Sequence, residues 1–463
     1  ICQTLPKSVY LCGMKLQENR YKLTGDVDLL ELVDRFDAPL YVYDAAVIKG
    51  KLDRMRAAFD VPRLQINYAC KALSNINILR LFKEWGTGLD TVSVQEVQLG
   101  LRAGFAPRDI IFTPNCISVE ELAQAIGYGV RINIDNISIL EQFGTLHPEI
   151  PLCIRINPHI MAGGNSKISV GHIDSKFGIS IHQIPHVIKI VSALGLTIEG
   201  LHMHTGSDIL DAEVFLQASE ILIQAAKDFP DLNYLDFGSG FKVPYKPGDV
   251  ETDIEDLGAR LSVRFREFCK DYGRDVALLF EPGKFLVSES GYFLARCNVV
   301  KTTPATVFAG LDSGLNHLIR PMFYNSYHHI VNISNTGEKK RIYTVVGYIC
   351  ETDTFGINRQ LSEVREGDIL CFLNAGAYCF AMASNYNSRY RPAEVLVVDG
   401  EAHLIRERET IEDLLRGQVD LVRGGGSGSR VGDRCETTFD GEHSSWDSEE
   451  WYRIGKDGRR IKE

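Results

Sequence analysis

The chain has 463 residues, which is too long for one ordinary domain and suits two or three. Apolar residues make up 44% and charged residues 24%, as in a globular protein with a substantial core. The net charge of −11 argues against a nucleic-acid-binding surface, and no apolar run approaches the roughly 20 residues that cross a bilayer. We therefore expect neither nucleic acid nor a membrane as a partner.

The first 44 residues precede the regular part of the pattern. Residues 1–13 lack the basic and apolar regions of a secretory signal, and we interpret them as an accessory extension. Residues 14–44 include the apolar segment Ala38–Tyr43. We expect this segment to add a strand to a β domain that is encoded later in the chain.

Between residues 45 and 288, short apolar runs alternate with helical segments. Runs without polar faces suit parallel strands that are covered on both sides. Eight such units predict a (β/α)8 TIM-type barrel. The rival fold, a doubly wound sheet, would carry a G-x-G-x-x-G motif near its first strand, and that motif is absent there. The expected strands are Ile66–Cys70, Leu89–Ser93, Ile110–Thr113, Arg131–Ile134, Leu152–Ile156, Ile198–His204, Tyr234–Phe237 and Ala277–Phe280.

Two helices of this region have clear signals. Ser118 and Glu121 form a capping box ahead of an apolar run that Gly127 closes. A second helix is predicted to bury one stripe, made of Val214, Ala218, Ile221 and Ala225.

Residues 289–420 change to the pattern of an all-β domain. Arg341–Val346, Ile369–Leu373 and Glu394–Val398 are strand-like, and Asp399-Gly400 is a hairpin turn signal. Thr410 and Asp413 cap a last short helix that ends at Gly417. Residues 421–463 begin with a Gly/Ser linker and continue as a polar tail that we expect to be disordered.

The 11 cysteines show no CxxC spacing, so neither a zinc site nor a disulfide framework is predicted, and no metal is expected. Free thiols favour the reducing cytoplasm.

Lys71 closes the first barrel strand, at the face where barrels of this type carry their chemistry. Desolvation would lower the pKa of its amine and leave a neutral nucleophile for Schiff-base chemistry. A solvated lysine is the plain alternative. Other polar segments follow later strands or lie in the β domain: His202–Ser207, Gly238–Gly240, Glu281–Lys284, Cys350–Asp353 and Gly376–Tyr378.

The plain alternatives for these segments are structural. Gly238–Gly240 resembles many turns, but we expect a helix to start beside it, where free N–H groups can hold a phosphate. His204 could simply pack in the barrel. We prefer that interpretation for His202, whose side chain is expected to point the opposite way. Cys350 could be a buried thiol.

With Asn385-Tyr386-Asn387 and Arg391-Pro392-Ala393-Glu394, these motifs make residues 20–417 resemble the fold-type III pyridoxal-phosphate (PLP) decarboxylases. In that family an alanine-racemase-like barrel precedes a β domain. The resemblance implies PLP as the cofactor and a homodimer with shared active sites. A racemase is disfavoured, because those enzymes pair the ring nitrogen with a base, whereas Glu281 is an acid.

The resemblance also implies roles for single residues. Lys71 would form the Schiff base with PLP, His204 would stack on its ring, and Glu281 would keep the ring nitrogen protonated. Cys350 would reprotonate the product from a second subunit. The phosphate would be held by Ser207, Gly238, Ser239, Gly240 and Tyr378.

Members of the family act on ornithine, lysine, arginine, carboxynorspermidine or diaminopimelate. Residues 316–324 resemble the carboxylate-binding stretch of the members that act on diaminopimelate. We therefore expect conversion of meso-diaminopimelate to L-lysine and CO2, the last step of lysine biosynthesis. The alternatives are a decarboxylase for ornithine, lysine or a D-amino acid, or a non-catalytic PLP-binding protein, which would be expected to lack Lys71 or Cys350. The expected substrate-binding residues are Lys284, Arg320, Tyr324, Glu351 and Tyr378.

Lys284 departs from the family pattern, which often has Arg after Glu-Pro-Gly, and it lacks the planar fork of a guanidinium. The Gly-Glu pair of the family is altered to Gln95-Glu96, while the nearby Asp90 is kept. The long segment Asn157–Gly178 is predicted to be a lid over the site, with His159 and His172 packing within it.

Overall fold

The computed structural model describes residues 13–160 and 175–419, together with residues 453–454 and 460–461. The chain divides into a unit of residues 1–416 and a unit of residues 417–463. The second unit includes the antiparallel strands β21 (Arg453–Ile454) and β22 (Arg460–Ile461). The predicted Gly/Ser linker, most of the polar tail and residues 1–12 lie outside the described residues.

The predicted barrel is confirmed. Eight parallel strands of the described residues close into a ring, because β10 pairs with β8 at one seam and β12 pairs with β4 at the other. Every predicted strand is present, with ends within two residues of the expected ones. The strands are β4 (Leu64–Ala69), β5 (Gly88–Thr91), β6 (Ile110–Phe112), β7 (Arg131–Ile134), β8 (Leu152–Asn157), β10 (Ile198–Met203), β11 (Tyr234–Asp236) and β12 (Ala277–Phe280); the short β9 (Ile179–Ser180) pairs parallel with the end of β8.

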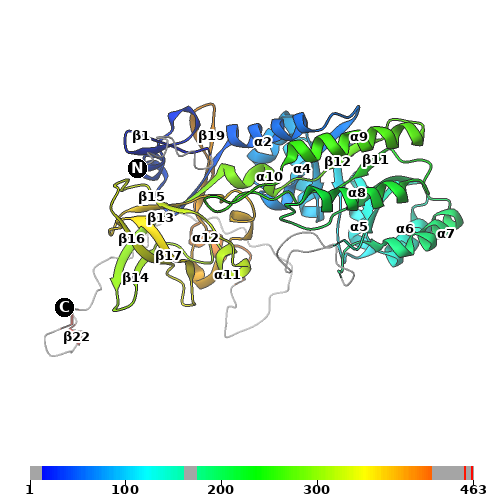
Figure 1. Cartoon of the computed structure of the whole chain (residues 1–463). Coiled ribbons are helices and arrows are strands. Elements are labelled where there is room, and N and C mark those ends of the chain that lie inside the picture. The colour runs from blue at the N-terminus through cyan, green and yellow to red at the C-terminus, as the bar shows by residue number, and fades with distance from the viewer. Residues whose placement is uncertain (1–12, 161–174, 420–452, 455–459, 462–463) are drawn as a thin grey trace, which may run out of the picture. The chain divides into compact units, whose positions relative to one another are not determined.

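Helices cover the outside of this ring, and α8 and α9 run along it in Figure 1. Their starts follow from capping side chains: Ser118 accepts a hydrogen bond from the amide of Glu121 at 3.2 Å and begins α5, as predicted. The helices are α2 (Ala45–Ala58), α3 (Ile76–Glu84), α4 (Val94–Ala103), α5 (Val119–Gly127), α6 (Ile137–Leu146), α7 (Ile184–Leu194), α8 (Ala212–Ala226), α9 (Ile254–Tyr272) and α10 (Lys284–Val287).

The stripe predicted for α8 is only half correct. Ala218 and Ala225 are buried, but Val214 and Ile221 are half-exposed. The buried face instead centres on Phe215 and Leu222, so it is rotated from the predicted one. The prediction considered only aliphatic residues and therefore missed Phe215, which lies at the centre of the buried face.

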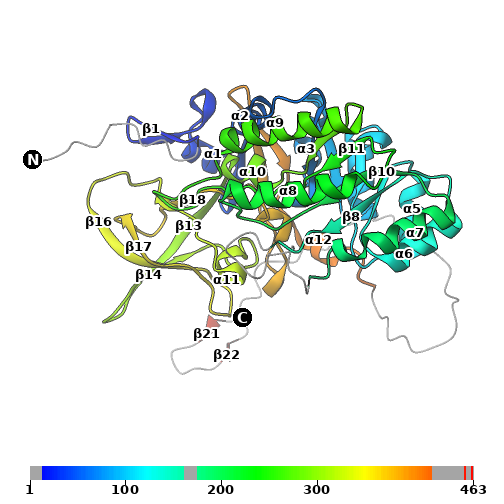
Figure 2. The same cartoon turned by 45° about the vertical axis from the view of Figure 1, so that its right-hand side comes forward.

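The β domain is a branched sheet with the strand order β17-β16-β14-β13-β3-β19-β20; β18 attaches to β13, and β15 pairs with β18. Figure 2 shows β13, β14, β16 and β17 gathered in this domain. The strands are β3 (Leu40–Asp44), β13 (Gly291–Thr302), β14 (Val307–Leu311), β15 (Ile330–Asn332), β16 (Lys340–Val346), β17 (Thr354–Ser362), β18 (Ile369–Phe372), β19 (Ala393–Val398) and β20 (Glu401–Arg406). Smaller elements are β1 (Lys15–Gln17), β2 (Arg20–Lys22), α1 (Leu29–Phe36), α11 (Arg320–Tyr324) and α12 (Ile411–Leu415).

The N-terminal strand β3 lies in the middle of this sheet, as predicted. It pairs antiparallel with β13 and parallel with β19. Tyr41 and Tyr43 belong to the main core, whereas Leu40 and Val42 belong to a second cluster. Because successive side chains of a strand point to opposite faces, β3 joins two cores.

The predicted turn and cap of the β domain are also confirmed. Asp399 and Gly400 both have positive φ, at 50° and 82°, and connect β19 to β20. Thr410 and Asp413 form a reciprocal capping box at the start of α12. Among the helices that the structure describes, none has the length and hydropathy that a bilayer crossing requires.

Candidate active site

A cavity of about 580 Å³ lies where the barrel strands end and residues of the β domain approach them. The barrel contributes Lys71, His204 and Glu281 to its lining, and the β domain contributes Arg320 and Tyr378. The amide of Tyr378 donates to the carbonyl of Ala72 at 2.8 Å, which fixes this approach. A separate apolar groove of about 700 Å³ beside α7 and α8 contains none of the predicted site residues.

Lys71 faces this cavity and pairs with a buried acid. Its Nζ lies 3.4 Å from Oδ2 of Asp90, and its side chain is 42% exposed because the cavity is open. Burial alone would lower the pKa of Lys71, but Asp90, Tyr378 and Glu281 together raise it. The expectation that desolvation leaves this amine neutral is therefore wrong for the free side chain.

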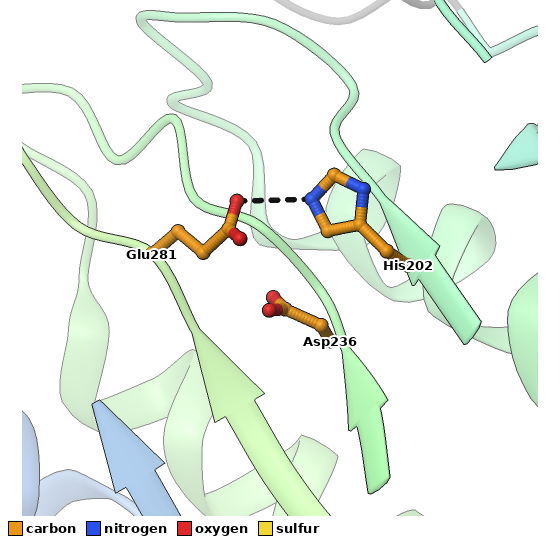
Figure 3. Close-up of side chains that lie close together, drawn as sticks. All are labelled: His202, Asp236 and Glu281. Carbon is orange, nitrogen blue, oxygen red and sulfur yellow. Dashed lines mark hydrogen bonds and ion pairs between the residues drawn. The ribbon is translucent and has the colours of Figure 1, made fainter. Parts of the chain in front are cut away.

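Glu281 accepts a hydrogen bond from His202, over 2.9 Å between Nε2 and Oε2 (Figure 3). Burial would raise the pKa of Glu281, but the charge and hydrogen bond of His202 lower it to about 2. The prediction that His202 points away from His204 is wrong, since both line the cavity. Residues two apart on a strand share a face, so the alternation itself should have placed them together.

His204 stands beside the Gly238–Gly240 segment. Its Nδ1 accepts a hydrogen bond from the amide of Ser239 at 3.3 Å. Burial, with the charges of Arg155 and Lys71, holds the pKa of His204 well below its usual range, so the ring is neutral. Ser207, Ser239 and Gly240 line the cavity next to it.

Gly238–Gly240 forms a tight cradle, but the helix expected to begin beside it is absent, since α9 begins at Ile254. Gly240 has a φ of +115°, and a Cβ there would lie 2.1 Å from the carbonyl oxygen of Gly206. The segment is therefore held against the loop after β10, and glycine is required for this close approach.

Two cations approach the cavity with different surroundings. Lys284, predicted for substrate binding, is buried and forms an ion pair with Asp208. Arg320 is only 8% exposed, and its Nε has no hydrogen-bond partner in the described part of the chain. Its guanidinium lies 5.6 Å from the ring centroid of Tyr324 and 5.9 Å from that of Tyr378, and one nitrogen donates to Ser326 at 3.4 Å.

Cys350 and Glu351 do not line the cavity. Both are exposed, so the alternative of a buried thiol is wrong for Cys350. Asn387 contacts the Cys350 sulfur, with 3.2 Å between Nδ2 and Sγ, and Tyr386 donates to Glu351 at 2.9 Å. The Asn385–Asn387 motif therefore holds the segment that carries Cys350.

Sequence reasoning missed further residues of the cavity. Arg155 is buried in β8 with its guanidinium 4.8 Å from the ring centroid of Phe177, and both line the cavity. A charged residue inside the apolar run Leu152–Asn157 was the available signal. Asp208 had no signal, because only the fold brings it to Lys284.

The predicted lid can be assessed only at its ends. Residues 161–174, including His172, lie outside the described residues. His159 is half-buried, and its ring lies 5.3 Å from that of His182.

These side chains fit pyridoxal phosphate. A primary amine opens into the cavity for the aldehyde, an acid with a lowered pKa stands ready for the ring nitrogen, and a glycine cradle too close for any Cβ suits a phosphate. A barrel with this site, followed by a β domain, defines the class of PLP-dependent decarboxylases.

Comparison with known proteins agrees with this class. The family described as "Pyridoxal-dependent decarboxylase, pyridoxal binding domain" matches residues 45–288. A diaminopimelate decarboxylase from Methanothermobacter thermautotrophicus is 39% identical over 416 residues, covering 88% of this chain and 97% of the relative. One from Escherichia coli (strain K12) is 35% identical over 405 residues, covering 84% and 95%. The crystal structure of the Helicobacter pylori diaminopimelate decarboxylase complexed with L-lysine has a TM-score of 0.77 at 32% identity, covering 84% and 98%.

The chain belongs to the diaminopimelate decarboxylase family of PLP-dependent enzymes.

Proposed function

We propose that this chain decarboxylates meso-diaminopimelate to L-lysine and CO2, the last step of lysine biosynthesis. The names of its relatives support this substrate. The observation that carries the proposal is Arg320, a buried guanidinium without an acidic partner among the described residues, in the cavity that also holds Lys71. An unpaired buried charge is costly, and a second carboxylate on the substrate would neutralise it.

The residues around the cofactor have separable tasks. When bound, PLP supplies an electron sink for the electron pair that remains when CO2 departs. Lys71 would hold the cofactor, Glu281 would keep a proton on the ring nitrogen, and neutral His204 would pack against the ring. A charged Glu281 is required, because only a carboxylate stabilises that positive nitrogen. The phosphate is held by Ser207, Gly238, Ser239, Gly240 and Tyr378.

The distal end of the substrate carries a carboxylate and an ammonium. Arg320 and Tyr324 bind the carboxylate, with Lys284 adding positive charge despite its pairing with Asp208. Tyr378 lines the same cavity, with its ring centroid 5.9 Å from the Arg320 guanidinium, and would also contact the substrate. L-Lysine and L-ornithine lack the distal carboxylate and would leave Arg320 unpaired.

Glu351 binds the distal ammonium, and Cys350 returns a proton to the product. Both residues are exposed in one chain, so they reach the cavity of a second chain in a homodimer. The eight cysteines that the structure describes are not in disulfides, which supports the cytoplasm as the location.

Product analysis tests the substrate. The holoenzyme should release CO2 from meso-diaminopimelate and yield L-lysine, with L-lysine and L-ornithine turned over at least about 100-fold less efficiently, as expected for about 3 kcal/mol of lost pairing. Equal turnover of L-ornithine would refute the assignment.

Arg320→Met should raise KM for meso-diaminopimelate by about 100-fold while PLP binding, measured by visible absorbance, is kept. The matched control is Arg359→Met. Arg359 also has a buried Nε without a partner among the described residues, but it lies over the Tyr327 ring, 3.8 Å from its centroid, and not in the cavity. An equal rise in KM for both variants would show that Arg320 does not bind the carboxylate.

A further inference from the structure

At the wall of the cavity, Glu281 lies in a cluster of three buried side chains from neighbouring strands, with His202 and Asp236 (Figure 3). His202 on β10 is the register partner of Asp236 on β11, and Glu281 follows β12. One donor atom from each lies within 4.8 Å of the others. In Figure 3 the Asp236 carboxyl points towards that of Glu281, on the side away from the hydrogen bond to His202.

The two carboxyl groups have different partners. Oε2 of Glu281 is bonded to His202, and Lys71 adds a second positive charge nearby. Oδ1 of Asp236 accepts from the amide of Gly238 at 2.9 Å. Among the described residues, Oδ2 of Asp236 and Oε1 of Glu281 are buried without any other hydrogen-bond partner. One proton between these two oxygens would satisfy both.

A divalent cation is the competing occupant, because an imidazole and two carboxylates can ligate one. However, the same cavity is lined by Lys71 and Arg155, whose positive charges oppose a dication. Two adjacent buried carboxylates that are both ionised repel each other, which costs free energy. One proton relieves this repulsion without adding a second positive charge. A proton is therefore the better-supported occupant.

The surroundings of Asp236 decide which group holds the proton. The titratable and charged groups that face it are His202 on β10, Glu281 after β12, Asp90 on β5, and Cys153 and Arg155 on β8. Burial, followed by the charges of Glu281 and Asp90, raises the pKa of Asp236 well above its usual range. Glu281 has the opposite shift, to a pKa of about 2.

We propose that Asp236 is a positioning residue, protonated at working pH, whose hydroxyl donates to Oε1 of Glu281 and fixes that carboxylate, in its charged form, where it would meet the ring nitrogen of PLP. This inference rests on the proposed function, because it assigns Glu281 to the ring nitrogen. A carboxylate has about four acceptor sites, so Glu281 can accept from Asp236, His202 and the ring together. The hydrogen bond from Asp236 keeps Glu281 charged and prevents its carboxylate from rotating away from this position.

Asp236→Asn is the decisive variant, because an amide reproduces a protonated carboxyl group. Its oxygen can accept from Gly238 and its NH2 can donate to Glu281. Asp236→Asn should bind PLP within about threefold of wild type, whereas Asp236→Ala should bind it at least about tenfold more weakly, the effect of one lost hydrogen bond to a charged group. The pH profile of PLP binding should be unchanged in the Asn variant.

Infrared spectroscopy of the apoenzyme at pH 8 gives a readout that needs neither substrate nor turnover. The spectrum of wild type minus Asp236→Asn should contain the carbonyl stretch of a protonated carboxyl group. Asp312→Asn is the matched control: burial raises the pKa of Asp312 to about 6, so this group is ionised at pH 8 and its difference spectrum should lack that band.

Absence of the band, or a shifted pH profile in Asp236→Asn, would overturn the proposal, since both would mean that Asp236 carries a charge. Divalent-cation binding to the wild-type apoenzyme that Asp236→Asn abolishes would overturn it too. If the enzyme failed to decarboxylate diaminopimelate while the band was present, the proposed substrate would fail and the proton assignment would stand.

Discussion

Asp90 decides the charge of the amine on which the cofactor chemistry depends. It is 1% exposed, and burial followed by the charge of Glu281 raises its pKa to about 6, so it is ionised above that pH. In this form it holds the Lys71 ammonium at 3.4 Å. The free enzyme therefore presents a charged lysine, and the amine must lose a proton before it can attack an aldehyde.

This pairing predicts how Asp90→Asn changes cofactor capture. Removing the largest of the effects that raise the Lys71 pKa lowers that pKa, so more of the amine is neutral at a given pH. We expect the apoenzyme variant to capture PLP about tenfold faster at pH 8 for each unit by which the pKa falls. Stopped-flow absorbance measures the rate. The wild-type rate should rise with pH throughout the range from 7 to 9, and the variant rate should level off earlier.

Lys71→Ala is the control, because it should capture no PLP covalently. Equal rates and equal pH dependence for wild type and Asp90→Asn would show that Asp90 does not set the state of the amine.

At the scale of elements, local signals predicted the barrel well and the site partly. Buried strands such as β12 are continuous apolar runs, so their bounds follow from the sequence alone. The family resemblance placed Lys71, Glu281 and Arg320 in one cavity, and the structure brings them together. The pairings of Lys284 with Asp208 and of Lys71 with Asp90 join segments far apart in the chain, so only the closed fold could reveal them.

The Gly238–Gly240 turn gives a prediction about one such element. Gly240→Ala forces a Cβ to within 2.1 Å of the Gly206 carbonyl oxygen, and it imposes a φ of +115° on an L residue. The two loops that carry Ser207 and Ser239 must then separate. We expect PLP affinity, measured by absorbance titration, to fall at least about tenfold, the equivalent of one lost charge-assisted hydrogen bond.

Gly248→Ala separates crowding from backbone strain. Gly248 also has a positive φ, +76°, but a Cβ there meets nothing within 4 Å. This variant should lose some stability and keep its PLP affinity. If both variants lose affinity equally, backbone strain and not the close contact is responsible.

At the scale of the whole molecule, one buried carboxylate ties the barrel to the β domain. Glu394 accepts from Tyr43 on β3 at 2.8 Å and from Asn75 ahead of α3 at 3.0 Å, and it pairs with Arg406 on β20. Glu394, the last residue of the Arg391–Glu394 motif that supported the family resemblance, therefore has a structural role. Its contacts join β19 and β20 to β3 and to the start of α3 in the barrel, while Cys350 remains at the surface.

The exposed position of Cys350 predicts complementation between two inactive variants. Lys71→Ala and Cys350→Ser should each lose nearly all activity on meso-diaminopimelate. If sites are shared across a two-fold axis, a mixed dimer has one site with both substitutions and one site with neither. After joint unfolding and refolding in equal amounts, half of the dimers are mixed, so about one quarter of wild-type activity should return.

Mixing Lys71→Ala with Glu281→Ala is the matched control, because these residues line the same cavity of one chain and every site then stays defective. Recovery confined to the first mixture would mean that Cys350 acts in the partner's cavity. No recovery in either mixture, with mixed dimers present by mass, would place the whole site within one chain.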